Sequence, residues 1–492
     1  MVNTTQSLTR VSSGIPGLDS LLHGGLVSNR LYLVIGAPGT GKTLVGMQFL
    51  RAGLGDDEDV LFIHGEESRD DLIVNAAELG LDLTDAEFLD IGPESEFFAQ
   101  SRSYDVVNPQ DVEDDHLVAD IREAIEDLDP DRVLIDPISQ LQYLEPSEYQ
   151  FRKRIIAFTR FLKDRDTTVL ATKTPGARMD EQLRSLSDGV ISLKYGDAGR
   201  RVSVPKHRGV GQQDGTHGFE IRSSGLDVYP ALRPDRHDRA FDPTQHRSGI
   251  GGLDALLNGG LEQGTVTVIS GPSGVGKSTT AGKFLHTAAA NGDRALAYLF
   301  EESLETFTHR MESFGMPVTR LREDGSLTVE EIMPQTWSPE QFAQLVRTQV
   351  EEQAAELVVI DGIEGYRTAI RGGEGAVNLR QRLHALTRYL INMNVTVILI
   401  DERHAVTGLP RPTGSNISYL ADNLVFQQYL ELDGELQRAV GVLKKRVSGF
   451  ETAPRRFWIT AEGIEVGDPL THVQGVLDGA PEHTDADDDT PW

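Results

Sequence analysis

Cysteine is absent from the 492 residues of this chain, and so are long apolar runs. Without thiols the chain can form neither disulfide bonds nor thiolate metal sites, which suits a reducing cytosol. No apolar run approaches the roughly 18 residues that a membrane span needs. The opening stretch MVNTTQSLTR lacks the charged-then-apolar pattern of a secretory signal. We therefore expect a cytoplasmic globular protein with no membrane contact.

Positive charge is also in short supply. The chain has 47 basic and 76 acidic residues, a net charge of −29, and only 10 of the basic residues are lysines. Broad binding of nucleic acid needs a basic surface and is therefore disfavoured, although a local basic groove stays compatible with this composition. Scarce lysine with abundant acid resembles proteins of salt-loving archaea, where salt screens the self-repulsion. The acidity is interpreted as a solvation adaptation that says little about partners.

Two glycine-rich stretches, at 36–43 (GAPGTGKT) and 271–278 (GPSGVGKS), fit the P-loop pattern G-x-x-x-x-G-K-[ST]. The glycines let backbone N–H groups point at phosphate oxygens, the lysine reaches the β- and γ-phosphates, and the hydroxyl ligates Mg²⁺. Each stretch follows an apolar run, at 30–36 and 264–271, and precedes a helical pattern whose N-terminus would face the anion. The residues predicted to bind a nucleotide are Gly36, Pro38, Gly39, Thr40, Gly41, Lys42, Thr43, Gly271, Ser273, Gly274, Val275, Gly276, Lys277 and Ser278.

The chain repeats itself. SGIPGLDSLLHGGL (13–26) matches SGIGGLDALLNGGL (248–261) at an offset of 235, and the same offset joins the two P-loops and two copies of the tripeptide EES. A constant offset over this length indicates a duplicated domain rather than a shared motif. The predicted organisation is a first domain at 8–232, an exposed linker at 233–243, a second domain at 244–470 and an acidic disordered tail at 471–492.

Short apolar runs alternate with helical patterns in each copy, as at 59–65, 132–138 and 167–173 of the first. This alternation predicts an α/β fold with a mostly parallel sheet and helices on both faces. Ligands of such folds bind at the carboxyl ends of the strands, so polar residues that end the strands are the candidate site residues.

Asp136 and Asp361 each end an apolar run, VLID and VVID. An acid beside a P-loop is expected to hold Mg²⁺ directly or through water, together with the hydroxyls of Thr43 and Ser278. The alternative is an aspartate that merely caps the next turn.

Two glutamate pairs, Glu66–Glu67 and Glu301–Glu302, follow another strand of each copy. A carboxylate in this position can orient and deprotonate a water, or a hydroxyl, in line with the γ-phosphate. The alternative is a structural role, because acids at a helix start are favoured by the helix dipole.

Two basic pairs, Lys206 with Arg208 and Lys444 with Arg446, lie late in each copy. Residues i and i+2 of a strand share a face, so the cations of each pair point the same way. They could grip the γ-phosphate bound to a neighbouring subunit, as an arginine finger does. The alternative is a solvated pair of surface charges.

These motifs, present twice and in this order, resemble the KaiC family, the double-domain RecA-like ATPases of the circadian clock and their archaeal relatives. The resemblance covers roughly residues 8–480, and YLELDGELQRAVGVLKKR (429–446) is also similar to the family's second domain. It implies two tandem RecA-like P-loop NTPase domains and a hexameric double ring with ATP between subunits.

The resemblance also implies roles for the halves and their residues. The first half would be a slow ATPase that uses Glu66 and Glu67, and the second would phosphorylate its own Ser or Thr residues through Glu301 and Glu302. The lysines and arginines of the basic pairs would contact ATP across the interface. The implied cofactors are ATP and Mg²⁺.

The phosphate-accepting Ser-Thr pair of the family falls on Ser418 and Tyr419. The serine matches and the threonine is replaced, with Thr413 and Ser415 as nearby hydroxyls. At most one acceptor therefore carries over, Ser418, and the alternative is an ordinary loop serine.

Three functions remain in competition. The first is a KaiC-like ATPase that acts as a slow switch on an unknown signalling partner, with possible Ser/Thr autokinase activity. The second is a recombinase or helicase of the RecA class that moves on DNA, which the acidic composition disfavours. The third is a scaffold that binds ATP and barely hydrolyses it, which the two intact glutamate pairs disfavour.

Overall fold

The chain forms two compact units, Met1–Ala231 and Leu232–Trp492, and each is described by itself. The computed structural model describes residues 8–92, 121–140, 148–176, 180–196, 199–234, 244–333, 337–369, 376–403, 417–432, 434–460, 463–471, 473–476 and 482–483. Thr413 and Ser415 lie outside the described residues.

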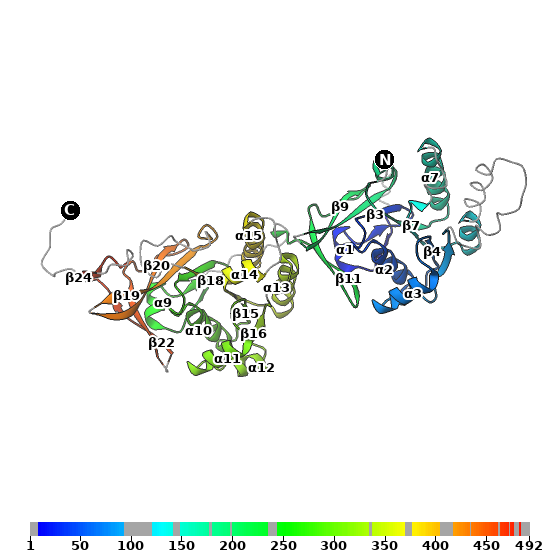
Figure 1. Cartoon of the computed structure of the whole chain (residues 1–492). Helices are drawn as coiled ribbons and strands as arrows, with labels where there is room; N and C mark the ends of the chain where they lie inside the picture. Colours follow the sequence, from blue (N-terminus) through cyan, green and yellow to red (C-terminus); the bar gives the residue numbers. More distant parts are fainter. Residues whose placement is uncertain are drawn as a thin grey trace, which may run out of the picture. The chain divides into compact units, whose positions relative to one another are not determined.

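The first unit alternates strands and helices and then ends in consecutive strands (Figure 1). Its elements are β1 (Arg10–Val11), α1 (Pro16–Leu21), β2 (Leu26–Val27), β3 (Leu31–Ile35), α2 (Lys42–Gly55), β4 (Val60–His64), α3 (Arg69–Glu78), β5 (Glu87–Asp90), β6 (Arg132–Asp136), α7 (Glu148–Lys163), β7 (Thr168–Lys173), α8 (Asp180–Leu186), β8 (Gly189–Gly196), β9 (Gly199–His207), β10 (His217–Arg222) and β11 (Gly225–Tyr229).

The second unit repeats this plan. Its elements are β12 (Gln245–His246), α9 (Gly251–Leu256), β13 (Leu261–Glu262), β14 (Val266–Gly271), α10 (Lys277–Ala290), β15 (Ala295–Leu299), α11 (Leu304–Ser313), α12 (Val318–Glu323), β16 (Leu327–Glu331), α13 (Pro339–Gln353), β17 (Leu357–Asp361), α14 (Ile363–Ala369), α15 (Ala376–Asn392), β18 (Thr396–Glu402), β19 (Asn423–Leu432), β20 (Glu435–Lys445), β21 (Arg455–Thr460), β22 (Gly463–Pro469), β23 (Val473–Gln474) and β24 (Glu482–His483).

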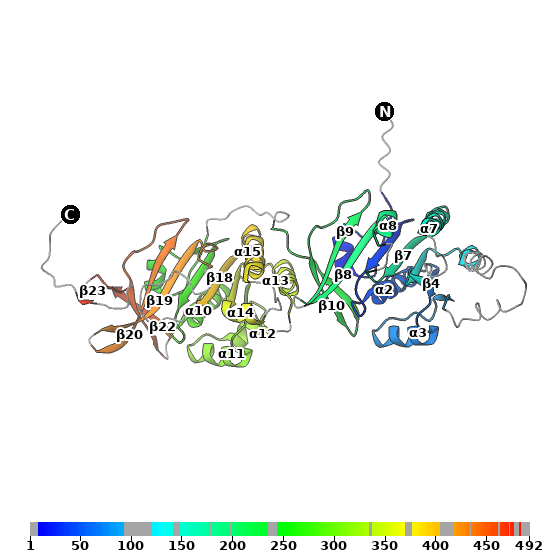
Figure 2. The same ribbon diagram turned by 45° about the horizontal axis from the view of Figure 1, so that its top comes forward.

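Each unit contains one nine-stranded sheet, and the two sheets have the same topology. The order is β11-β10-β9-β8-β3-β7-β6-β4-β5 in the first and β22-β21-β20-β19-β14-β18-β17-β15-β16 in the second. The strands from β8 to β5, and from β19 to β16, pair in parallel, whereas the remaining strands pair antiparallel (Figure 2). The prediction of a mostly parallel sheet in each half is therefore confirmed.

Helices cover both faces of each sheet because successive strand residues point to opposite sides. In the first unit Val34 and Phe62 pack with α1, α2 and α3, while their neighbours Leu33 and Ile63 pack with α7 and α8. In the second unit the helices α9 to α12 cover one face, and α13 to α15 cover the other. Strands buried on both sides explain why their sequences are continuous apolar runs rather than alternating ones.

Strand pairing continues past residue 470, where the sequence placed the end of the second domain. The strand β23 pairs antiparallel with β24. Val473 and Val476 pack against Leu430 and Leu432 of β19. Residues 484–492, the last part of the predicted tail, lie outside the described residues.

Candidate nucleotide-binding sites

The two P-loops connect a central strand to a helix in each unit. The first joins β3 to α2, and the second joins β14 to α10. Gly41 and Gly276 are the N-caps of these helices, with φ of 98° and 117°, and Gly39 and Gly274 both have φ of 75°. Side chains other than glycine are strained in this left-handed region. The glycines are therefore required by the turn that directs the loop's N–H groups and the helix N-terminus at one point.

The P-loop lysines fold back over their own loops. Lys42 Nζ donates to the carbonyl of Ala37 at 3.2 Å, and Lys277 Nζ donates to the carbonyl of Pro272 at 2.8 Å. Burial lowers the pKa of both ammonium groups, and nearby carboxylates oppose this shift; beside Lys277 the strongest is Glu402. A second negative group, such as a phosphate, would stabilise the charged form of either lysine.

The acids at the strand ends have different neighbours in the two halves. In the second half Ser278 Oγ donates to Asp361 Oδ1 at 3.1 Å, so the two residues predicted to hold a cation already face one site. Burial, with Glu302 and Glu301 nearby, raises the pKa of Asp361 to about 7. A hydroxyl and a buried carboxylate at this distance form the hard-oxygen donor set that Mg²⁺ prefers. In the first half Asp136 instead accepts a hydrogen bond from Thr172 of β7.

The glutamate pairs come directly before α3 and α11. In the first half Glu67 Oε2 accepts from the side-chain amide of Asn75 at 3.0 Å. In the second half Glu302 forms an ion pair with Arg310 of α11, and Glu301 Oε1 accepts from the backbone N–H of Gly365 at 3.0 Å. The helix caps are the serines that follow the pairs, Ser68 and Ser303, so capping does not require the glutamates.

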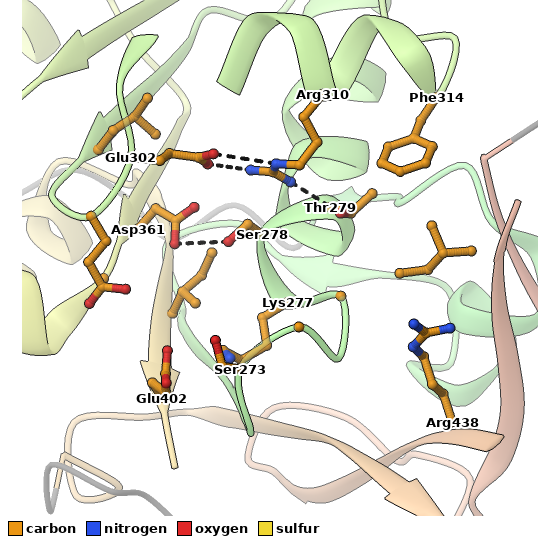
Figure 3. Close-up of a pocket in the computed structure, with 17 residues that line it drawn as sticks. Ser273, Lys277, Ser278, Thr279, Glu302, Arg310, Phe314, Asp361, Glu402 and Arg438 are labelled. Atoms are coloured by element: carbon orange, nitrogen blue, oxygen red, sulfur yellow. Dashed lines mark hydrogen bonds and ion pairs between the residues drawn. The ribbon is translucent and has the colours of Figure 1, made fainter. Parts of the chain in front are cut away.

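A cavity of about 530 Å³ in the second half is lined by eight of the residues predicted for that site, among them Lys277, Ser278 and Asp361 (Figure 3). Its walls come from the P-loop, from the carboxyl ends of β15, β17 and β18, from α11 and from the strands β20 and β21. Nine of the lining residues were not predicted from the sequence: Thr279, Leu299, Arg310, Phe314, Gly362, Ile400, Glu402, Arg438 and Ile459. For Arg310 alone, a position-by-position comparison of the two copies could have drawn attention to the residue, since Arg310 stands where the first copy has Asn75.

The basic pairs lie where β9 and β20 end, beside the segments that lead into β8 and β19. Lys206 Nζ and an Nη of Arg208 both donate to the carbonyl of Ser185, at 2.9 and 3.2 Å. Lys444 Nζ donates to the carbonyls of Ser418 and Ala421 at 3.4 and 2.6 Å.

Each arginine of these pairs also makes an ion pair. Arg208 contacts Asp188 at 3.1 Å, and Arg446 contacts Asp422 at 3.2 Å. The arginine side chains remain 54% and 55% exposed. Ser418, the candidate acceptor, is half-buried beside Lys444.

Two mostly parallel sheets of the same topology, each with a P-loop at its centre and acids at the neighbouring strand ends, define a protein with two tandem RecA-like P-loop NTPase domains. The chain belongs to the KaiC family: the family model described as ATPase: KaiC matches residues 11–233 and again 246–471. This match confirms the resemblance seen in the sequence motifs.

Curated relatives are similar along nearly the whole chain. The circadian clock oscillator protein KaiC of Acaryochloris marina is 28% identical over 98% of this chain and 93% of the relative. The KaiC of Synechococcus elongatus is 28% identical over 98% of this chain and 94% of the relative. The KaiC of Prochlorococcus marinus strain SARG is 29% identical over 97% of this chain and 96% of the relative. In the described part of the chain, no helix combines the length and the apolar character needed to cross a bilayer.

Proposed function

We propose that both halves of the chain bind ATP with Mg²⁺ and hydrolyse it slowly, so that nucleotide occupancy acts as a switch for a signalling partner. The observation that carries this proposal is the second site. There the P-loop lysine, the Ser278–Asp361 pair and a glutamate pair line one cavity. Membership of a family of ATPases supports the same activity in the first half.

Mg²⁺ would be held by Ser278 and Asp361 in the second half and by Thr43 and Asp136 in the first. When bound, the cation neutralises charge that develops on the β- and γ-phosphate oxygens. The P-loop N–H groups and Lys42 or Lys277 would hold the same oxygens, and a glutamate of each pair would take a proton from the attacking water.

We also propose that copies of the chain assemble into a hexameric ring with ATP at the subunit interfaces. Lys206, Arg208, Lys444 and Arg446 would then contact the phosphates of a neighbouring subunit. The exposed guanidinium groups of the two arginines support this arrangement, because a trans-acting cation must project beyond its own domain.

Phosphate release from the purified chain in high salt tests the hydrolytic function. We expect Glu66→Gln/Glu67→Gln to remove the contribution of the first half, since losing a general base costs about a hundredfold in rate. Glu78→Gln, an exposed glutamate on α3, is the matched control and should leave the rate unchanged. Turnover equal to that of Lys42→Ala/Lys277→Ala would favour an ATP-binding scaffold. Stimulation by single-stranded DNA would favour the recombinase alternative.

Autophosphorylation of the second half is proposed at Ser418. Its support is position: Ser418 lies beside Lys444, which is proposed to contact a nucleotide across the interface. After incubation with ATP, the intact mass of the chain should increase by one phosphate, and Ser418→Ala should abolish the increase. Tyr419→Phe, which changes the exposed neighbouring residue, should retain it. A phosphate that persists in Ser418→Ala would place the acceptor elsewhere.

A further inference from the structure

The two glutamate pairs have chemically different partners at equivalent positions. Each pair is followed by a serine N-cap, Ser68 or Ser303, which begins α3 or α11. The seventh residue after this serine is Asn75 in the first half and Arg310 in the second, again at an offset of 235. The same helical position therefore presents a neutral amide to one pair and a cation to the other.

Arg310 uses its whole guanidinium group. Its Nη2 donates to Glu302 Oε1, and its Nε donates to Glu302 Oε2 at 3.4 Å. Its Nη1 donates to Thr279 Oγ1 at 3.2 Å (Figure 3). It thus links the glutamate pair to the P-loop helix α10. Asn75 donates a single hydrogen bond, at 3.0 Å, to one oxygen of Glu67.

We propose that Arg310 is a positioning residue that withdraws Glu302 from proton transfer and leaves Glu301 as the proton acceptor of the glutamate pair. A carboxylate held by two N–H groups of a cation loses charge-assisted bonds when it takes a proton, so it is a poor acceptor. A carboxylate that accepts from one neutral amide keeps lone pairs for a proton. Glu67 therefore stays able to act beside Glu66. This inference rests on the proposed hydrolytic function.

The assigned step in the second half is a hydrolysis. The oxygen of water bonds to the γ-phosphorus, and one of its protons passes to a carboxylate oxygen of Glu301. The bond between the γ-phosphorus and the β–γ bridging oxygen breaks, and its electron pair remains on ADP. Arg310 takes no proton in this step, because a guanidinium stays charged at any physiological pH.

The test compares glutamate replacements in the presence and absence of Arg310. Glu66→Gln/Glu67→Gln serves as the background, so that phosphate release reports the second half. With Arg310 present, we expect Glu301→Gln to lower kcat about a hundredfold and Glu302→Gln less than about twofold. In Arg310→Asn, Glu302 is released, and Glu302→Gln should then lower kcat about tenfold. Arg310→Lys keeps the positive charge but not the two parallel N–H groups of the guanidinium. In this variant the effect of Glu302→Gln on kcat should lie between the effects seen with Arg and with Asn at position 310.

The reciprocal exchange in the first half provides the matched control. In a Lys277→Ala background, Asn75→Arg should reduce the effect of Glu67→Gln on kcat to less than about twofold. This variant keeps the inference testable if Arg310→Asn impairs folding, which thermal unfolding would reveal.

Several results would overturn the inference. An effect of Glu302→Gln that is the same with Arg310 and with Asn at 310 would show that the ion pair does not govern proton transfer. A second half that hydrolyses no ATP, with either Arg or Asn at position 310, would also contradict the inference. If Arg310→Asn raised KM for ATP and left kcat unchanged, Arg310 would be a nucleotide-binding residue instead. Failure of the proposed function looks different, since the unmodified chain would then release no more phosphate than Lys42→Ala/Lys277→Ala.

Discussion

Two equivalent residues, His207 and Lys445, show how the copies diverged at the scale of single side chains. Both are buried at the end of the strand that carries the basic pair. Lys445 is charge-compensated by Glu262 at 2.7 Å, whereas His207 lies against the hydroxyl of Tyr32 at 3.1 Å. The backbone N–H of Val27 donates to the oxygen of the same hydroxyl. The hydroxyl proton of Tyr32 can therefore be donated to a neutral imidazole of His207. Burial lowers the pKa of His207 to about 4.

This low pKa predicts that acid destabilises the first half. The unfolded chain takes up the imidazole proton near pH 6.5, but the folded chain takes it up only near pH 4. The stabilisation by neutral His207 is therefore complete above pH 6.5, falls by about 1.4 kcal/mol for each pH unit between 6.5 and about 4, and is lost below that. His207→Gln, which cannot titrate, should show a shallower loss of the unfolding midpoint between about pH 7 and about pH 5. Equal slopes in both proteins would contradict this assignment.

At the scale of elements, the strand–loop–helix units of the P-loops were predictable because their constraints are local. A glycine pattern, an apolar run before it and a helical run after it define the unit without reference to the rest of the chain. What the local pattern does not contain is the strand that packs on the loop. Ile459 of β21 lies 2.6 Å from the position that a Cβ of Gly276 would occupy.

Gly276→Ala should therefore disturb both folding and binding. The left-handed φ of 117° disfavours alanine by about 1 kcal/mol, and the new methyl group also displaces Ile459 and the start of α10. Gly292→Ala is the control, because Gly292 has φ of 96° but nothing within 4 Å of the added methyl. Gly276→Ala should lose more stability than Gly292→Ala because of the added clash, and only Gly276→Ala should weaken ATP binding, by about tenfold or more. Titration with ATP and thermal unfolding would measure the two effects.

At the scale of the whole molecule, the net charge of −29 and the exposed arginines bear on assembly. Self-repulsion of acidic copies opposes association, and salt screens it over a distance of roughly 3 Å at 1 M. Cations directed at a bound triphosphate would favour a ring only when the nucleotide is present. Assembly should thus require both salt and ATP.

Light scattering in about 1 M KCl should give a hexamer with ATP and smaller species without it. Arg446→Ala or Arg208→Ala should weaken the ATP-dependent assembly, because each removes a proposed contact between subunits. Arg122→Ala removes an arginine that is 63% exposed and pairs with Glu126 four residues further along the chain, and this variant should assemble normally. A monomer with ATP at every salt concentration would remove the ring from the proposal.

The sequence by itself determined the duplication, the α/β architecture, the family and the positions of both P-loops. These features depend on repeats, on apolar periodicity and on short motifs, all of which are visible in one dimension. The sequence also placed acids at the strand ends, because a buried strand is a continuous apolar run and the first charged residue after it marks where the strand ends.

Only the tertiary structure decided which side chains share a cavity. Arg310 and Arg438 come from a helix and a strand that no local pattern connects to the P-loop, yet both line the second site. Likewise, the structure pairs Asp136 with Thr172 but Asp361 with Ser278, although the two acids look alike in sequence. The physical reason is that hydrogen bonds and ion pairs between distant segments form only after sheet topology has brought the strand ends together.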